Sequence, residues 1–324
     1  WKPIAVTCGK DYSVRVWNLL DRRIETSKFF NEEPSAITIH PSGLYVAIAF
    51  TDRIRLASIL LDDIAVTKEI NVRGTQEIKF SRGGMYLAAA NGANVQIFNT
   101  YTGALVSTLR GHTAKVRSIV WQNFDSKLIT MGQEGTVYFW DSSTGKRSEE
   151  SSFPGIVPIT TGTALTDGAK AYTVSNERIL KEIPIKKSFD AITGQEIPAK
   201  QPKDLQLDRY ISNVVIDDSS KILFLGSGGD ENLPGSIISI LTVPNLASSY
   251  EVTPLHSSSI TAMCLSKDGN MLFTGDASGS LIVSEIEKGK GIQDKAREGI
   301  TASDFVDEIL IRKSDLDDRR AKAD

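Results

Sequence analysis

The stretch that decides the fold is GHTAKVRSIVWQNFDSKLITMGQEGTVYFWDSSTGK, residues 111–146. It opens on Gly-His and carries Trp-Asp near its end. Between these pairs lie three segments of strand length, 116–121, 127–131 and 136–140, which alternate or run apolar. Residues that favour turns separate the three segments. The stretch therefore predicts one unit of three short β-strands joined by turns.

The same unit recurs along the chain. Turns rich in Gly, Ser or Asp precede second strands at 41–43, 81–84, 123–126, 166–168, 217–220 and 266–269, and second turns follow third strands at 99–103, 141–145 and 190–194. The predicted ends of the third strands are Trp17, Ser58, Phe98, Trp140, Phe189, Leu241 and Ser284. Their spacings are 41, 40, 42, 49, 52 and 43 residues, and a period near 40 to 45 is typical of β-propellers. The sequence thus predicts an all-β fold, a seven-bladed propeller over residues 1–286.

Two departures from regularity are expected. The longer intervals indicate insertions in the fifth and sixth units, the second of them at 229–235. The first unit is incomplete, because the chain enters a strand-like run at 4–8 directly after Trp1 and has no residues for an innermost strand. Since a propeller closes on itself to hide its edges, we expect that strand to lie upstream, in a longer protein.

The unit at 111–146 resembles a WD repeat from end to end. The resemblance implies a buried hydrogen-bond network of His, Ser or Thr, Asp and Trp, which fixes the blade geometry only when every member is satisfied. His112 and Thr130 are 18 residues apart, as are His256 and Thr274. The later members are Thr7, Asp11 and Trp17 in unit one and Thr130, Glu134 and Trp140 in unit four, while Ser278 and Ser284 replace the acid and the Trp in unit seven. Only unit four is nearly complete, so the blades are expected to rely mainly on apolar packing.

Composition narrows the function classes. Of 324 residues, 40% are hydrophobic and 24% charged, and the net charge of −3 does not favour a nucleic-acid partner. The two cysteines, Cys8 and Cys264, lie in apolar runs and are predicted to be reduced core thiols of a cytoplasmic protein. No apolar stretch approaches the 18 residues of a membrane span, so no membrane association is expected.

No constellation for catalysis is found. The three histidines, His40, His112 and His256, lie in separate units without ligand-spaced neighbours, so no metal, cofactor or catalytic residue is predicted. His40 precedes a proline in a turn and is expected to be solvated. Gly145-Lys146 lacks the earlier glycine of a phosphate-binding loop, and Arg147 stands where Ser or Thr would bind magnesium.

The last 38 residues differ from the repeats. Half of them are charged, and 287–313 is predicted to be a charged linker or strap. Its apolar part, 304–313, is either the outer strand of the seventh blade or a strap on the propeller. Residues 314–317 resemble a capping box, so 314–324 is predicted to start a helix. A short charged helix is marginal alone, and we expect a coiled coil that continues beyond Asp324 and pairs with itself or another chain. The alternative is a frayed terminus without a continuation.

Longer strings point to a narrower group. TCGKDYSVRVWN (7–18), the stretches 40–64 and 99–121, and LIRKSDLDDR (310–319) resemble the second propeller of cilia- and flagella-associated WD-repeat proteins and its passage into a coiled coil. The resemblance implies a non-catalytic scaffold of the ciliary axoneme. Its implied partners are inner dynein arm subunits, other proteins of the doublet and tubulin.

Two other function classes stay open. One is a cytosolic interaction hub, such as a ubiquitin-ligase substrate receptor, and the other is a propeller hydrolase. A peptide receptor would be expected to present arginine and aromatic anchors at its channel mouth. Lys115 and Arg117 start one predicted inner strand and form a candidate partner surface, whereas Ser35, Thr75 and Ser258 occupy the comparable places.

Overall fold

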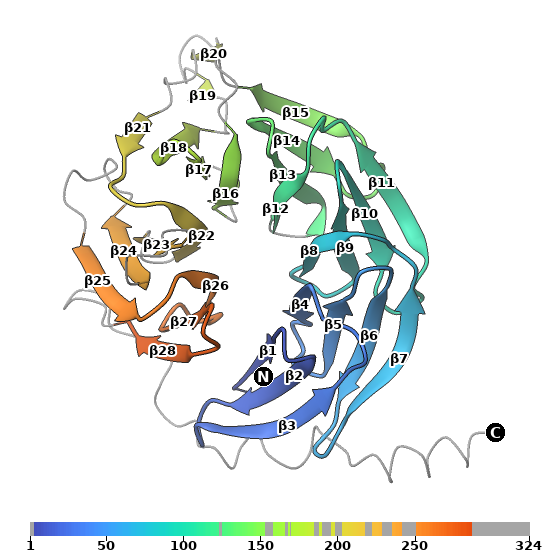
Figure 1. Cartoon of the computed structure of the whole chain (residues 1–324). Coiled ribbons are helices and arrows are strands. Elements are labelled where there is room, and N and C mark those ends of the chain that lie inside the picture. The colour runs from blue at the N-terminus through green and yellow to red at the C-terminus, as the bar shows by residue number, and fades with distance from the viewer. Residues whose placement is uncertain are drawn as a thin grey trace. The chain divides into compact units, whose positions relative to one another are not determined.

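The computed structural model describes residues 3–122, 125–152, 158–165, 168, 170–184, 188–189, 196–197, 203–217, 222–228, 235–241 and 251–286. These residues form strands and turns, without an α-helix among them. Seven consecutive antiparallel sheets of three or four strands follow one another along the chain, as the colour sequence in Figure 1 shows. The all-β, seven-bladed propeller predicted from the repeat is therefore confirmed.

The described residues divide into two compact units, each treated by itself. Unit 1 comprises 3–111 and 142–145 and holds blades one to three. Blade one is β1 (Ile4–Cys8), β2 (Ser13–Asn18) and β3 (Arg23–Phe29); blade two is β4 (Ala36–Ile39), β5 (Tyr45–Ala49), β6 (Ile54–Ile59) and β7 (Ile64–Ile70); blade three is β8 (Thr75–Phe80), β9 (Tyr86–Asn91), β10 (Asn94–Asn99) and β11 (Leu105–Arg110).

Unit 2 comprises the described residues of 112–141 and 146–286 and holds blades four to seven. Blade four is β12 (Val116–Trp121), β13 (Lys127–Gly132), β14 (Thr136–Asp141) and β15 (Arg147–Ser152); blade five is β16 (Ile159–Ala164), β17 (Lys170–Ser175), β18 (Ile179–Pro184) and β21 (Lys203–Gln206). Blade six is β22 (Ile211–Asp217), β23 (Ile222–Ser227), β24 (Gly235–Leu241) and β25 (Glu251–His256); blade seven is β26 (Ile260–Leu265), β27 (Met271–Asp276) and β28 (Leu281–Glu285).

The predicted end of the third strand in blade five is wrong. Phe189 lies in β19 (Ser188–Phe189), which pairs with β20 (Glu196–Ile197) between β18 and the outer strand β21. The third strand is β18, where Ile183 faces Ala171 as Trp140 faces Leu128 in blade four. The interval from Trp140 to Ile183 is 43 residues (183 − 140), so this interval keeps the repeat period and the insertion follows the third strand.

Blade one has three strands among the described residues. Trp17 on β2 faces Ala5 on β1, as Trp140 faces Leu128, so β1 and β2 correspond to the second and third strands of blade four. The described residues of blade one thus supply no innermost strand. The predicted strap at 287–313, the helix at 314–324 and most of the predicted insertion at 229–235 lie outside the described residues.

Inner strands share one irregularity. In β8, β12, β16, β22 and β26 the register shifts after the first residue, which leaves one residue unpaired. Such a bulge bends the strand and re-aims a side chain. In blade four the unpaired residue is Arg117, so a long cationic side chain stands at the start of this inner strand.

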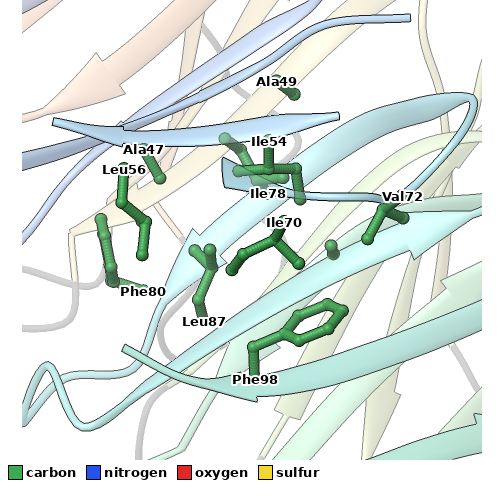
Figure 2. Packing of buried hydrophobic residues seen from close by; sticks show 11 residues of the cluster. Ala47, Ala49, Ile54, Leu56, Ile70, Val72, Ile78, Phe80, Leu87 and Phe98 are labelled. Carbon is green, nitrogen blue, oxygen red and sulfur yellow. The ribbon is translucent and has the colours of Figure 1, made fainter. Parts of the chain in front are cut away.

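The hydrophobic core is divided among several clusters. One joins blades two and three, where Ile54, Leu56, Ile78, Leu87 and Phe98 point toward one another (Figure 2). Middle strands such as β5 and β9 are buried over four consecutive residues, because both faces of such a strand are covered. Full burial of one leucine stabilises the fold by about 1.5 to 3 kcal/mol, so these clusters carry much of the stability.

Polar contacts join successive blades of unit 1 at their outer strands. Thr26 Oγ1 on β3 donates to Leu61 O at 3.1 Å, and Lys28 Nζ donates to Asp63 Oδ1 at 3.0 Å and to Ile64 O at 2.6 Å. Each contact reaches from an outer strand to the third turn of the following blade, so the turns hold the outer edges together.

The two cysteines differ from the prediction in part. Neither forms a disulfide, and burial raises the pKa of the Cys8 thiol to about 11. Cys264 is exposed on β26 and is not a core residue, because this inner strand presents alternate side chains to solvent. Over the described residues, no helix has the length and apolar character that a membrane crossing requires.

Candidate functional site

Blade four holds a buried chain of polar side chains. Trp140 Nε1 on β14 donates to Thr130 Oγ1 on β13 at 2.8 Å, and Thr130 Oγ1 lies 2.7 Å from His112 Nε2. His112 Nδ1 contacts the Glu134 carboxylate. Thr136 Oγ1 at 2.6 Å and the backbone N of Ala114 at 3.2 Å also donate to that carboxylate. The chain therefore links the loop before β12 to the turn between β13 and β14.

The protonation states follow from this geometry. Burial lowers the pKa of His112 below its usual range, although the bond to Glu134 opposes the shift. Burial alone would raise the pKa of Glu134, but the bonds from Thr136 and His112 outweigh burial and lower it. A neutral His112 then donates from Nδ1 to the ionised Glu134 and accepts from the Thr130 hydroxyl at Nε2.

Blade seven contains a second buried histidine network. His256 Nε2 at the end of β25 lies 2.7 Å from Thr274 Oγ1, and His256 Nδ1 lies 3.1 Å from Asp276 Oδ2. The other oxygen of Asp276 accepts from Ser278 Oγ at 2.6 Å and from the backbone N of Ser278 and Ser280 at 3.0 and 2.8 Å. Burial opposes ionisation here, but these donors and His256 hold the pKa of Asp276 at about 2.

The structure thus corrects the assignment of Ser278 to the acid position. The carboxylate comes from Asp276, two residues after Thr274, whereas Glu134 follows Thr130 by four. Gly132 occupies the place of Asp276 in blade four, and a Cβ there would lie 2.2 Å from Glu134 Oε1 and 2.3 Å from His112 Nδ1. The missing side chain of Gly132 therefore makes room for the longer glutamate. Ser284 faces Leu272, the place that Trp140 takes opposite Leu128.

Blade one carries only the later part of the network. Trp17 Nε1 donates to Thr7 Oγ1 at 2.8 Å, as in blade four. Asp11 accepts from Ser13 Oγ at 2.7 Å and pairs with Arg15 at 2.5 Å. These bonds from Ser13 and Arg15 lower the pKa of Asp11. Asp11 is exposed, so it braces the turn between β1 and β2 without taking part in a buried chain.

His40 is buried, contrary to the expectation that it is solvated. Its Nδ1 accepts from the backbone N of Ser42 at 3.1 Å, which leaves Nε2 to donate to Gly84 O at 3.1 Å in the next blade. Gly84 has φ +79, and a Cβ there would lie 2.1 Å from His40 Nε2. Two other side chains also approach a turn glycine closely: a Cβ at Gly168 would contact Gln122, and a Cβ at Gly269 would contact Asp217. In the sequence, His40 is followed only by a proline-containing turn, and nothing there indicates this contact between blades.

The histidines do not form a reactive site. The side chains of His112 and His256 are 1% and 0% exposed, so no substrate reaches them. Over the described residues, no three His, Cys, Asp or Glu side chains gather as they would around a metal ion. The arrangement orients loops and strands within each blade, which is a structural task.

The candidate partner residues lie on the surface at one end of blade four. Lys115 and Arg117 flank Val116, the first residue of β12, and both are exposed. Arg117 Nη2 donates to Gln133 Oε1 in the turn between β13 and β14 at 3.1 Å. Both cations thus stand at the end of the blade where that turn lies.

Comparison with known proteins shows which repeats and which proteins these blades resemble. The model of the WD domain, G-beta repeat, matches residues 103–141 and 248–283, which contain most of the His112 and His256 networks. The chain thus contains WD repeats at these two places. It is 33% identical over 320 residues to "Cilia- and flagella-associated protein 57" of Mus musculus, covering 98% of this chain and 24% of the mouse protein. It is 29% identical over 336 residues to "Cilia- and flagella-associated protein 57 C" of Tetrahymena thermophila, covering 100% of this chain and 26% of that protein.

A more distant similarity is confined to part of the chain. The "77 kDa echinoderm microtubule-associated protein" of Lytechinus variegatus is 28% identical over 148 residues, or 44% of this chain and 22% of the sea-urchin protein. The chain spans about a quarter of the length of its cilia- and flagella-associated homologues.

Proposed function

We propose that this WD-repeat chain is a non-catalytic adaptor module of the ciliary axoneme that helps to dock or regulate inner dynein arms. The observation that carries the proposal is the 33% identity to a cilia- and flagella-associated protein over 98% of the chain. The partial similarity to a microtubule-associated protein supports a microtubule setting. The partners proposed are inner dynein arm subunits, other doublet proteins and tubulin.

The geometry supports a binding role over a catalytic one. The buried histidines are enclosed and already have partners: His112 bonds with Glu134, and His256 bonds with Asp276. Groups that perform chemistry on a substrate must be within hydrogen-bond reach of it. The exposed turns of the blades, by contrast, offer several separate surfaces for partner proteins.

The proposal is tested in a motile ciliate or flagellate. The gene is tagged at its own locus, axonemes are separated from membrane and soluble fractions, and the gene is then deleted. We expect the protein in the axonemal fraction, a changed beat on deletion, and loss of density beside the inner dynein arms in tomograms of the axoneme. A soluble cell-body protein whose deletion leaves beating and dynein arms intact would overturn the proposal and favour the cytosolic hub.

A further inference from the structure

One end of unit 2 presents cations without a carboxylate partner among the described residues. The guanidinium of Arg117 donates to the neutral amide of Gln133 at 3.1 Å. Arg178, between β17 and β18, donates to the backbone O of Asp208 at 3.1 Å and lies 4.9 Å from the ring centre of Tyr210. Lys115 is exposed beside Arg117. These side chains keep their charge available to another molecule.

The four residues belong to one continuous rim. Backbone hydrogen bonds connect the turns and strand starts of blades four and five along this end of the unit, and Tyr210 stands directly before β22, the first strand of blade six. We call Lys115, Arg117, Arg178 and Tyr210 the cationic rim. The connecting bonds are Gln133 N to Lys115 O at 2.8 Å, Ile159 N to Gln133 O at 3.2 Å, Asn176 N to Pro158 O at 3.1 Å and Leu207 N to Arg178 O at 2.8 Å.

The equivalent turn of blade two shows the opposite arrangement. Arg53 pairs with Asp52 at 2.8 Å and with Glu69 at 3.4 Å, and Arg55 pairs with Glu69 at 2.7 Å. Both arginines also lie within 4 Å of Glu32, at 3.9 and 3.7 Å. The cations of blade two are therefore neutralised within the blade, whereas those of the cationic rim are not.

Among the residues that the structure describes, carboxylates near the rim are few and unevenly placed. Glu177 and Asp208 are exposed beside Arg178. Glu134 is only 12% exposed and faces inward to His112 and Thr136. The excess of positive charge therefore lies at the blade-four end, with Lys115 and Arg117. At the other end, Tyr210 is 43% exposed and offers an aromatic surface of the kind that anchors partner proteins.

We propose that the cationic rim binds an extended, carboxylate-rich segment of a partner protein. Lys115, Arg117 and Arg178 contact its carboxylates, and the exposed ring of Tyr210 contacts an apolar or aromatic side chain of the same segment. Because the cations are spread over two blades, they match an extended acidic peptide better than a single phosphate, which arginines bind by converging on it. With a net charge of −3, the chain attracts such a segment only locally. The inference rests on the adaptor function and names the chemistry of one partner.

The test is fluorescence anisotropy of a labelled poly-L-glutamate peptide titrated with the purified chain at low salt. We expect saturable binding that weakens steeply as salt is raised, because paired surface charges are screened. The double variant Lys115→Gln/Arg117→Gln should weaken binding at least fivefold, and Arg178→Gln should weaken it severalfold. Far-UV circular dichroism and the Tm of each variant show whether the blades remain folded.

The matched control is Lys127→Gln/Lys267→Gln, which removes two exposed positive charges beside the turns between the first and second strands of blades four and seven, at the opposite end of the strands of unit 2. It should leave binding within twofold of the unaltered chain. Absence of binding, an equal loss in the control, or tighter rim-dependent binding of a phosphopeptide than of poly-glutamate would overturn the inference. A chain that fails this test but still localises to the axoneme refutes the rim alone and leaves the adaptor function standing.

Discussion

At the scale of single residues, a carboxylate reaches a buried histidine from two different backbone positions. In blade four the acid is Glu134 and the position two residues earlier is Gly132, while in blade seven Asp276 takes that earlier position and Ser278 the later one. Both solutions place a carboxylate against Nδ1 of the histidine. The glycine and the glutamate are therefore a matched pair, as are the aspartate and the serine.

The matched pairs predict a compensated double substitution. Gly132→Asp should lower the free energy of unfolding by about 2 kcal/mol or more, because its new side chain meets Glu134 and His112. Glu134→Ser should cost about 1 to 3 kcal/mol, since His112 loses its acceptor. The double variant reproduces the blade-seven pair and should lose less than the sum of the two, measured by urea unfolding. A fully additive loss would show that the two positions do not exchange roles.

His40 predicts a pH dependence of stability. Burial lowers its pKa below the ordinary 6.5, so the unfolded chain takes up the proton first as the pH falls. The stability that neutral His40 contributes is thus present above pH 6.5 and lost as the pH falls below it. His40→Gln copies Gln122 of blade four and does not titrate. We expect the free energy of unfolding of this variant at pH 7.5 to lie within about 1 kcal/mol of that of the unaltered chain. Toward pH 5.5 the variant should lose less stability than the unaltered chain.

The measurement is a series of urea unfolding curves between pH 7.5 and 5.5. His112 also has a lowered pKa, so part of the pH dependence should survive in the His40→Gln variant. Identical slopes for the variant and the unaltered chain would mean that His40 is not protonated preferentially in the unfolded state.

At the scale of elements, blades in unit 1 are held at their outer strands by contacts with the third turn of the next blade. The ion pair among these contacts is made by Lys28 of β3, whose side chain is 29% exposed and whose partner Asp63 is 20% exposed. Lys28 also donates to the backbone O of Ile64, a fully buried residue. A bond that satisfies a buried carbonyl contributes more than an exposed ion pair.

Lys28→Met therefore should lower the free energy of unfolding by about 1 to 3 kcal/mol, because Asp63 and the Ile64 carbonyl lose a donor. The matched control is Arg23→Met on the same strand, whose side chain is 72% exposed and which should stay within about 0.5 kcal/mol. Chemical unfolding and amide hydrogen exchange in β3 and β7 measure the effect. Equal losses in the two variants would show that the contact adds nothing beyond a surface charge.

At the scale of the whole molecule, apolar burial is divided among separate clusters within the two units. Leu87 belongs to the cluster of blades two and three, and Leu223 to a cluster in unit 2, and both are fully buried. Leu87→Ala and Leu223→Ala should each cost about 2 to 5 kcal/mol through the cavities they leave. Because the clusters share no residues, the loss of unfolding free energy in the double variant should equal the sum of the two single losses within about 0.5 kcal/mol. Chemical unfolding measures it. A coupling above about 1 kcal/mol would contradict independent clusters.

The sequence alone determined the blade count, most strand positions and the family of repeat. Strands such as 116–121 follow from local alternation and turn residues, which depend on neighbours along the chain. It also placed Thr130 and Trp140, as well as Thr7 and Trp17, at the spacing where the structure finds their hydrogen bonds.

Only the tertiary structure decided which residues meet across blades and turns. Asp276 was missed because a search at the spacing of Thr130 to Glu134 assumes one turn geometry, and His40 because its partner Gly84 lies 44 residues away. Phe189 was misplaced because a two-stranded insertion repeats the local pattern of a third strand. Spacing along a chain is fixed by local geometry, whereas burial and partner choice depend on packing between segments that the sequence does not place side by side.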